Sequence, residues 1–578
     1  MLVTTHLHRR LVPVLASVLI VFSLTFLYRA YHLYPSDKLS QWPHAAASGL
    51  SPTTEPLDEP SDYRAPAHRS EDTCATRFST AYLEGLRNRT GSYCTPGSRS
   101  SLTCFHTKAR DDEPDDSFCI GRGAVLDPAT RKFHLDCALR KLEPEEVEQG
   151  ILPFNRLRGY MYDTGPRNVF RDAVIVRQET GLARRSGETA VSEALDAEHM
   201  HLPASSDSSD GAPSSVLPPP KTYLLLKREG ETNPWHCLME IFSTYMTFDV
   251  LRMSRDPSRG GAPFFATDEA DDTQVVILDS REDGPFFDLW TLFARRRPVR
   301  LAHLLSRAGN NNADDDDAAA VDAVRRDANI IVPLAGGSNP LWREEWHVQP
   351  CHAAPLVDVF SSRIRGFYGV EDPPVRGGEE PIVVTLIDRR ETRRLKDQAA
   401  LLAALGKRGL HIRVQAVDFA ALSFPDQLRV ARETDVLVGV HGAGLTHVLF
   451  MRRGAGAVVE IQPDGLDQKG YRNVANLLDL GYFRIHGAGV SMPVDEADKD
   501  TEEEPGKERE MDSLKGVETE TQGRDNSTNT STATGVLKKR GDWHFMDVQV
   551  DEARFLDVVE TAVKFMYNKA LWSYDVNG

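Results

Sequence analysis

Short apolar runs alternate with amphipathic stretches through the second half of the chain. Near-continuous apolar runs are typical of parallel strands that are buried on both faces of a sheet. The sequence predicts strands at 221–227, 273–279, 381–387, 410–417, 435–440 and 457–461. It predicts helices at 235–253, 289–295, 397–407, 426–433 and 445–451. Because a strand followed by a helix is the rhythm of a doubly wound α/β fold, we expect two Rossmann-like halves, at 221–380 and 381–488, with a strand and helix return at 542–578.

The stretch of the chain that is long and apolar enough to cross a membrane lies near the N-terminus. Residues 11–28 form an uncharged run of 18 residues, which at about 1.5 Å per residue just crosses a hydrocarbon core of about 30 Å. Arg9 and Arg10 precede it, so the positive-inside rule predicts a cytosolic tail at 1–10 and a lumenal bulk. A cleaved signal peptide is the alternative, but the run is longer than the usual apolar region of such peptides. We expect a single-pass type II anchor, followed by a Pro-rich stem at 29–73.

Five of the seven cysteines gather in the segment 74–185. Their spacing does not match the paired cysteines of a zinc site, and we expect no metal site. In an oxidising lumen the cluster predicts one or two disulfides, whose connectivity stays open because the number is odd. Cys237 is expected either to pair with the fifth cysteine or to stay a buried thiol.

The composition is that of a globular chain with acidic loops. Of the 578 residues, 40% are hydrophobic and 26% are charged, which excludes disorder along the whole chain. The net charge of −17 repels nucleic acid, so we expect no nucleic-acid partner. Low-complexity insertions are predicted at 186–220, 310–320 and 489–541. The stretch 495–525 alone carries 13 acidic and 5 basic residues, a net of −8, so the global charge does not describe the active surface.

The stretch Asp435–His447 ends a predicted strand with a His-Gly-Ala-Gly turn and opens a helix. Backbone N–H groups at the start of a helix, together with the helix dipole, favour an anion beyond the strand. The third glycine of the dinucleotide fingerprint is missing here, and so is the lysine of a P-loop, which excludes both cofactor classes. The alternative is that the glycines serve only a tight turn and that His441 and His447 are hydrogen-bonded core residues.

A cationic turn follows the predicted strand at 381–387. Arg389 and Arg393 lie in this turn, Asp388–Arg394, and guanidinium groups can bind a diphosphate through paired hydrogen bonds. Two binding elements at neighbouring strand ends would flank one crevice. A solvated charged turn is the alternative.

A histidine and a glutamate lie four residues apart at the start of the first long helix. In the stretch Asn233–Glu240, His236 and Glu240 share a helix face, so the carboxylate can orient the imidazole or act as the base itself. Taken alone, such a pair is more often structural than catalytic.

These motifs together resemble the family 61 glycosyltransferases. The resemblance rests on Asn233-x-x-His236, on the turn Arg389–Arg394 and on the stretch His441–His447, and it covers roughly residues 221–572. The segments 74–137, 279–290 and 542–550 are most similar to the EGF-domain-specific O-linked N-acetylglucosamine transferases and their fungal relatives.

The resemblance implies a GT-B architecture, in which two Rossmann-like domains face a cleft. It implies inverting transfer from UDP-N-acetylglucosamine, or as second choice from UDP-xylose, to a hydroxyl of a secretory-pathway protein or glycan, without a prosthetic group or a metal. Our hypotheses for the residues are: diphosphate binding by Arg389, Arg393 and the backbone of Gly442 and Gly444; other donor contacts by His441, His447 and Glu460; substrate orientation by Asn233; and either Glu240 or His236 as the base. The expected location is the lumen of the Golgi or the endoplasmic reticulum, and the Golgi is favoured because no retention tetrapeptide closes the sequence.

Two other functions stay open. A metal-dependent GT-A glycosyltransferase needs an Asp-x-Asp motif at a strand end, whereas Asp314–Asp317 lie in a low-complexity loop and Asp271 and Asp272 precede a strand. A catalytically inactive lumenal protein that binds a sugar or a nucleotide would keep the same fold, because fold does not fix function.

Overall fold

The structure is a computed structural model that describes residues 60–63, 72–107, 115–157, 164–177, 221–309, 327–343, 345–374, 380–490, 543–568 and 573–575. The predicted anchor at 11–28, the insertions at 186–220 and 310–320, and all but the first two residues of the insertion at 489–541 lie outside these ranges. Within these ranges, no helix is long and apolar enough to cross a membrane.

The first sheet joins the cysteine-rich segment to the first Rossmann-like half. Its nine strands are β1 (Thr90–Ser92), β2 (Ser101–His106), β3 (Ser117–Asp127), β4 (Lys132–Asp136), β5 (Val174–Arg177), β6 (Thr222–Leu226), β9 (Thr273–Ile277), β10 (Val299–Arg300) and β11 (Ala328–Val332). The order is β1-β2-β3-β11-β6-β9-β10, with β4 beside β3 and β5 beside β4. β11, β6, β9 and β10 run parallel, whereas β3 pairs with β11 antiparallel. The strands predicted at 221–227 and 273–279 are therefore confirmed.

The second sheet is built from the second Rossmann-like half and the C-terminal return. Its strands are β12 (Ile382–Ile387), β13 (Ile412–Val417), β14 (Val436–Val440), β15 (Ala457–Pro463), β16 (Gly481–Val490), β17 (Asp547–Gln549) and β18 (Ser573–Asp575). The order is β13-β12-β14-β15-β16-β17, and β18 pairs with β16. The strands from β13 to β16 are parallel, and the four predicted ones among them are confirmed.

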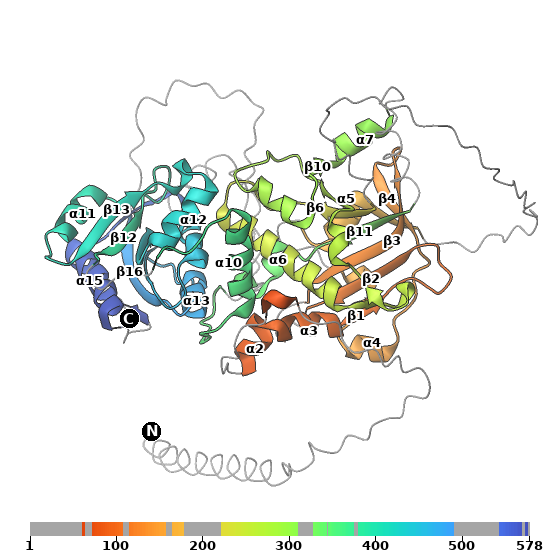
Figure 1. Ribbon diagram of the computed structural model, residues 1–578, viewed down its shortest axis with the longest axis horizontal. Helices are drawn as coiled ribbons and strands as arrows, with labels where there is room; N and C mark the ends of the chain where they lie inside the picture. The colour runs from red at the N-terminus through yellow and green to blue at the C-terminus, as the bar shows by residue number, and fades with distance from the viewer. Residues whose placement is uncertain are drawn as a thin grey trace, which may run out of the picture. The chain divides into compact units, whose positions relative to one another are not determined.

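Helices cover the sheets and connect their strands (Figure 1). The α-helices are α2 (Asp72–Phe78), α3 (Thr80–Asn88), α4 (Pro144–Glu148), α5 (Pro166–Ala173), α6 (Pro234–Met253), α7 (Leu301–Gly309), α9 (Pro340–Arg343), α10 (Pro355–Phe367), α11 (Gln398–Gly406), α12 (Phe424–Glu433), α13 (Gly470–Leu477) and α15 (Glu552–Asn568). Two segments predicted as α-helices, 289–295 and 445–451, instead form the tighter 3-10 helices η6 (Phe287–Phe293) and η9 (Ala443–Phe450).

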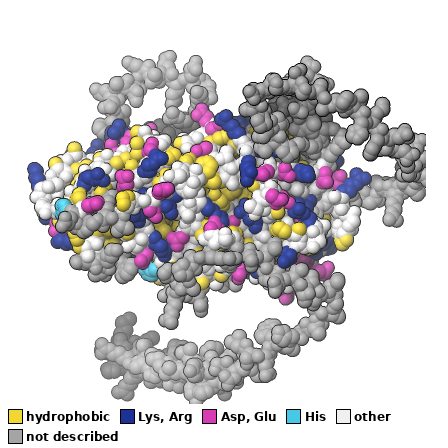
Figure 2. Space-filling view, in the orientation of Figure 1, with side chains coloured by type: hydrophobic (Ala, Val, Ile, Leu, Met, Phe, Trp, Pro, Cys, Tyr) yellow, Lys and Arg dark blue, Asp and Glu magenta, His cyan; other side chains and the backbone are white. Residues whose placement is uncertain are grey.

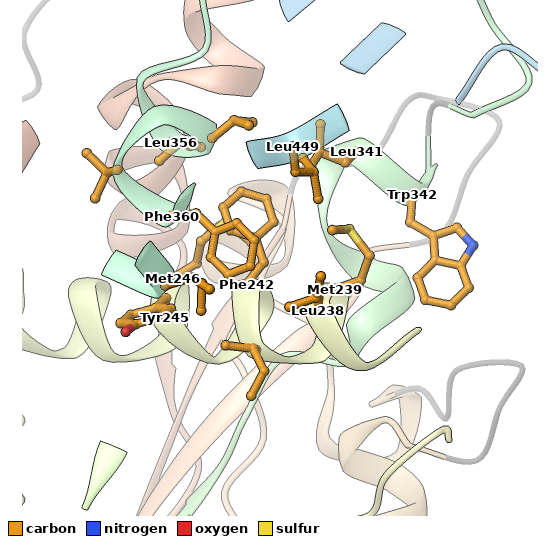
Figure 3. Packing of buried hydrophobic residues seen from close by; sticks show 14 of the residues in the cluster. Leu238, Met239, Phe242, Tyr245, Met246, Leu341, Trp342, Leu356, Phe360 and Leu449 are labelled. Carbon is orange, nitrogen blue, oxygen red and sulfur yellow. The ribbon is translucent and has the colours of Figure 1, made fainter. Parts of the chain in front are cut away.

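Helix α6 lies at the centre of the largest apolar core. Asn233 caps its start by accepting a hydrogen bond from the Trp235 N–H at 3.0 Å, and Pro234 occupies the first turn, where no N–H is needed. Phe242 of α6 packs against Phe360 of α10, with ring centroids 4.9 Å apart, and Leu449 of η9 joins the same cluster (Figure 3). The two halves of the molecule therefore share one continuous core.

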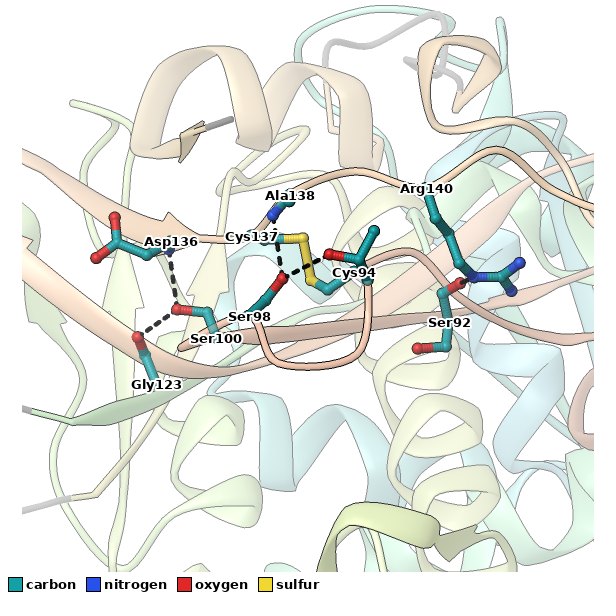
Figure 4. Close-up of a disulfide and its surroundings, with 10 residues drawn as sticks. Ser92, Cys94, Ser98, Ser100, Gly123, Asp136, Cys137, Ala138 and Arg140 are labelled. Carbon is teal, nitrogen blue, oxygen red and sulfur yellow. Dashed lines mark hydrogen bonds between the residues drawn. A yellow bond between two sulfur atoms is a disulfide. The ribbon is translucent and has the colours of Figure 1, made fainter. Parts of the chain in front are cut away.

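Three disulfides tie the first sheet and its surroundings together. Cys104–Cys119 joins the paired strands β2 and β3, and Cys94–Cys137 closes a nearby loop (Figure 4). Cys74–Cys351 joins residues that are 277 positions apart, and Cys237 is a buried thiol. The two disulfides within the cysteine cluster agree with the prediction, whereas the partner of Cys74 was not predicted, because the chain offers no spacing that marks it.

Each sheet contains a point where the strand order reverses direction. In the second sheet the chain starts at β12, adds β13 on one side and then β14 on the other. In the first sheet β6 has β9 on one side and β11 on the other. Ligands of open α/β sheets bind beyond the carboxyl ends of the strands at such reversal points. The loops after β6, β11, β12 and β14 are therefore the places to look for a site.

Candidate active site

A cavity of about 790 Å³ lies where these loops meet. That volume is within the range of about 300–1,000 Å³ that is usual for small-molecule sites. Its lining comes from both sheets: the loop after β6, the start of α6, the loops after β12 and β14, the start of α13, and the turn at 543–545. The cavity is therefore built at both reversal points at once.

The two strand tips predicted to bind an anion lie side by side on one wall. Arg393 donates from Nη1 to the carbonyl oxygen of His441 at 3.2 Å. A Cβ atom placed on Gly442 would lie 2.8 Å from Nη1 of Arg389 and 2.8 Å from Nη1 of Arg393. Burial lowers the pKa of Arg389, so an anion beside this guanidinium group would offset the cost of burying its charge. The guanidinium groups and the glycine backbone thus form one cradle.

The start of η9 supplies the amides of this cradle. Gly442 has φ 145° and ψ −176°, a backbone region that is essentially reserved for glycine. Gly444 is equally crowded, because a Cβ there would lie 2.9 Å from Cγ2 of Ile387. The first N–H groups of a helix have no carbonyl partner within it, and Gly442 and Ala443 line the cavity. Gly442 therefore lets the backbone approach a ligand closely, whereas Gly444, which does not line the cavity, lets η9 pack on Ile387.

His441 faces the cavity and is held from behind by Glu460. The Glu460 carboxylate contacts Nδ1 of His441 at 2.6 Å and accepts a hydrogen bond from the Tyr482 hydroxyl at 2.6 Å. Glu460 itself is fully buried in β15 and is not among the residues that line the cavity. Both oxygens of Glu460 are therefore used within the protein, one of them to fix the imidazole of His441.

His447 lies in the core rather than in the cavity lining. Its ring stacks on Phe419 with centroids 4.1 Å apart. Nε2 lies 2.7 Å from Oε1 of Gln427, and Nδ1 lies 2.8 Å from the carbonyl oxygen of Gly444. Burial lowers the pKa of His447 to about 4, and the hydrogen bond to Gly444 opposes this shift. His447 is therefore not among the residues that line the cavity, and its contact with a donor stays a prediction.

The opposite wall carries an acid and base pair. Glu229, in the loop that follows β6, and His236 both line the cavity. Oε2 of Glu229 lies 3.6 Å from Nδ1 of His236. Burial raises the pKa of Glu229 to about 8, although a hydrogen bond from Thr164 opposes the shift. Burial and the nearby Arg281 lower the pKa of His236 to about 4. At pH 7 the pair is therefore mostly neutral and poised to ionise near physiological pH.

Glu240, the other predicted base, lies behind this wall. Its Oε1 accepts a hydrogen bond from the Glu229 N–H at 2.6 Å, and the side chain packs against Gly336. Burial and the charge of Glu229 raise the pKa of Glu240 well above its usual value. Glu240 does not line the cavity, so it supports the backbone of Glu229 instead of meeting a substrate.

Several cavity residues escaped the sequence analysis. Glu229 could have been found, because it follows a predicted strand in the way that Arg389 does. Trp346 could not, because nothing in its local sequence ties it to strands far away in the chain. Trp543 and His544 lie in the segment 542–550 that carries part of the family resemblance, but that resemblance gave them no role. Over the described ranges, no group of three or more His, Cys, Asp or Glu side chains is placed to hold a metal ion.

The face of the molecule drawn in Figure 2 carries charges of both signs. Basic and acidic side chains are interspersed over the described residues there.

Comparisons with known proteins find similar sequences. Residues 235–458, which include His236 and the cradle, match the family Glycosyltransferase 61. The EGF domain-specific O-linked N-acetylglucosamine transferase of Drosophila melanogaster is 24% identical over 457 residues, 76% of this chain and 74% of the fly protein. The resemblance to family 61 is thereby confirmed.

Two further relatives match over shorter segments. The Bos taurus EGF domain-specific O-linked N-acetylglucosamine transferase is 34% identical over 151 residues, 26% of this chain. The match spans 28% of the length of that protein. The Protein O-linked-mannose beta-1,4-N-acetylglucosaminyltransferase 2 of Tetraodon nigroviridis is 25% identical over 221 residues, 37% of this chain and 35% of its own length. These similarities support a glycosyltransferase.

Proposed function

We propose that this chain, a relative of the glycosyltransferase 61 family, is an inverting glycosyltransferase that transfers a sugar from a UDP-sugar to a hydroxyl group. The observation that carries the proposal is the meeting of two strand tips in one cavity. Arg393 and Gly442 form a cradle for a diphosphate on one wall, and Glu229 and His236 offer a proton acceptor on the other.

The cradle has the chemistry that a departing diphosphate needs. In the reaction, the acceptor oxygen forms a bond to the anomeric carbon while the bond from that carbon to the diphosphate oxygen breaks. The electron pair leaves with UDP, so negative charge grows on the diphosphate. Guanidinium groups and oriented backbone N–H groups stabilise such charge without a metal ion. Arg393 and the amides of Gly442 and Ala443, which line the cavity, serve this purpose in the proposal. Arg389 does not line the cavity, and it adds its charge from beside Gly442.

The base is the pair of Glu229 and His236. The acceptor hydroxyl must lose its proton as it attacks, and a base works best when its pKa lies near the working pH. Either the ionised Glu229 takes the proton directly, or neutral His236 takes it while Glu229 accepts the Nδ1 proton. Both routes need an ionised Glu229, so activity should rise as the pH approaches the pKa of about 8. Asn233 fixes the start of α6 and hence the position of His236.

N-acetylglucosamine is the first choice of donor sugar and xylose the second. The names of the relatives described above support the first, because each is an N-acetylglucosamine transferase. The acceptor is a hydroxyl of a protein or a glycan in the secretory pathway. Three disulfides support an oxidising compartment, in keeping with a lumenal enzyme held by the anchor predicted at 11–28. The GT-B assignment is supported by two Rossmann-like sheets whose strand ends meet at one cavity.

The test is a panel of UDP-sugars offered to the full chain, beside the Arg393→Ala and His441→Ala variants. We expect transfer or slow hydrolysis with UDP-N-acetylglucosamine or UDP-xylose, and strongly reduced turnover in both variants. Tight UDP binding without turnover of any donor would favour an inactive nucleotide-binding protein. Activity that a chelator abolishes and manganese restores would favour the GT-A alternative.

A further inference from the structure

A buried aspartate in the C-terminal return contacts the turn that carries Arg393. Asp547, at the start of β17, is fully buried. It accepts a hydrogen bond from the Arg394 N–H at 3.0 Å and an ion-paired one from Nη2 of Arg394 at 2.8 Å. Nζ of Lys396 lies 3.2 Å from the same carboxylate. One side chain therefore holds the backbone and two cations directly beside Arg393.

The backbone after Asp547 makes further hydrogen bonds to the same turn. The Val548 N–H donates to the carbonyl oxygen of Arg394, and the Lys396 N–H donates to the carbonyl oxygen of Val548, both at 2.9 Å. Leu395 and Val548 form a parallel bridge. Backbone hydrogen bonds like those between paired strands thus hold the residues that follow Arg393.

Arg393 needs such support because its backbone is strained. Its φ is 56°, a left-handed conformation that few residues other than glycine adopt. A conformation of this kind is strained and persists only where the surroundings determine it. The contacts of Asp547 and Val548 with residues 394–396 are those surroundings. Without them the turn would relax and carry the Arg393 guanidinium away from Gly442.

An aromatic side chain from the same return segment also packs against the cradle. Trp543 packs its ring 5.4 Å from the Arg393 guanidinium carbon and 5.5 Å from the His441 ring centroid. His544 stacks on Trp543 with centroids 3.8 Å apart, and both residues line the cavity. A guanidinium group against an aromatic face is attracted to it and loses freedom to swing.

We propose that the return segment Trp543–Gln549 is a third element of the donor site, in which Asp547 is a positioning residue that holds the Arg393 turn and Trp543 walls the diphosphate. This inference rests on the proposed function and adds to it a segment that lies about 150 residues after Arg393 in the chain. The ligand class is a diphosphate, so changes in this segment should alter the affinity for both inorganic pyrophosphate and UDP.

The test compares Asp547→Asn with a matched control in the same sheet. Asp435, at the amino end of β14, also accepts a backbone N–H, that of Val383 at 2.8 Å, and also pairs with an arginine, Arg452. Asp435→Asn therefore removes a comparable buried charge at the end of the strands away from the cavity. Titration calorimetry of the full chain with pyrophosphate and with UDP measures the affinity, and thermal unfolding measures the stability of each variant.

We expect Asp547→Asn to weaken both ligands at least tenfold, while Asp435→Asn, with a similar loss of thermal stability, changes them less than twofold. Trp543→Leu gives a second measurement on a half-exposed side chain and should weaken both ligands several-fold. Unchanged affinity in Asp547→Asn and Trp543→Leu, or equal loss in Asp435→Asn, would overturn the inference and leave the proposed function standing. Absence of UDP binding by the unaltered chain would overturn the proposed function as well.

Discussion

Replacing Gly442 by alanine probes the cradle at its narrowest point. The new Cβ would lie 2.8 Å from Nη1 of both Arg389 and Arg393, which is closer than a carbon and a nitrogen can approach without displacement. Each displaced guanidinium group would lose a charge-assisted hydrogen bond worth about 1.5–3 kcal/mol, so the two together amount to about 3–6 kcal/mol. Since about 1.4 kcal/mol corresponds to tenfold in affinity, UDP should bind at least about 100-fold more weakly.

Strain alone must be separated from this collision. Gly409 also has a positive φ, 68°, but a Cβ there would meet nothing within 4 Å. Gly409→Ala therefore reports the cost of a left-handed alanine without touching the cradle. Titration calorimetry with UDP on both variants should show the loss in Gly442→Ala only. UDP affinity in Gly442→Ala within a factor of three of the unaltered chain would refute the placement of the diphosphate between these groups.

Three further predictions concern the groups around the cavity. Glu229→Gln should cut transfer at least about 100-fold and raise the melting temperature more at pH 8.5 than at pH 5. The Glu229 carboxyl keeps its proton up to about pH 8 in the folded protein but loses it near pH 4.3 in the unfolded chain. Glu229 therefore lowers the free energy of unfolding increasingly between these two pH values, and the glutamine removes this destabilisation. Equal increases in melting temperature at pH 5 and pH 8.5 would contradict this. Cys351→Ser should lower the unfolding free energy by up to about 5 kcal/mol, because the disulfide to Cys74 closes a loop with a sequence separation of 277; an unchanged denaturation midpoint would argue against the disulfide. Glu460→Gln should raise the KM for the donor more than it lowers kcat, because it loosens His441 without removing it; steady-state kinetics that show no change in KM would remove Glu460 from the site.

The parallel sheet and the cradle could be predicted because they depend on local sequence. A buried parallel strand is a continuous apolar run, and the residues just after it lie at a known edge of the sheet. That rule predicts that Arg393 and Gly442 lie close together, as they do in the structure. The same rule applied to the strand at 221–227 also indicates Glu229, which the helical spacing of His236 and Glu240 does not.

Other features depend on contacts that the local sequence does not encode. The helical spacing of His236 and Glu240 correctly places them on α6, but only the packing of Gly336 and the Glu229 backbone shows that Glu240 points behind the wall. The pairing of Cys74 with Cys351 and the reach of Asp547 to Arg394 join segments far apart in the chain. Such contacts follow from the fold as a whole rather than from any motif.

The most direct measurement is a structure of the full chain with UDP bound. The account predicts that the diphosphate lies in the cradle, with its oxygens within hydrogen-bond distance, about 3 Å, of the Arg393 guanidinium and the backbone N–H of Gly442 or Ala443. It also predicts that the position of the leaving oxygen faces Glu229 and His236 across the cavity. UDP bound elsewhere, with the cradle left to solvent, would contradict the account.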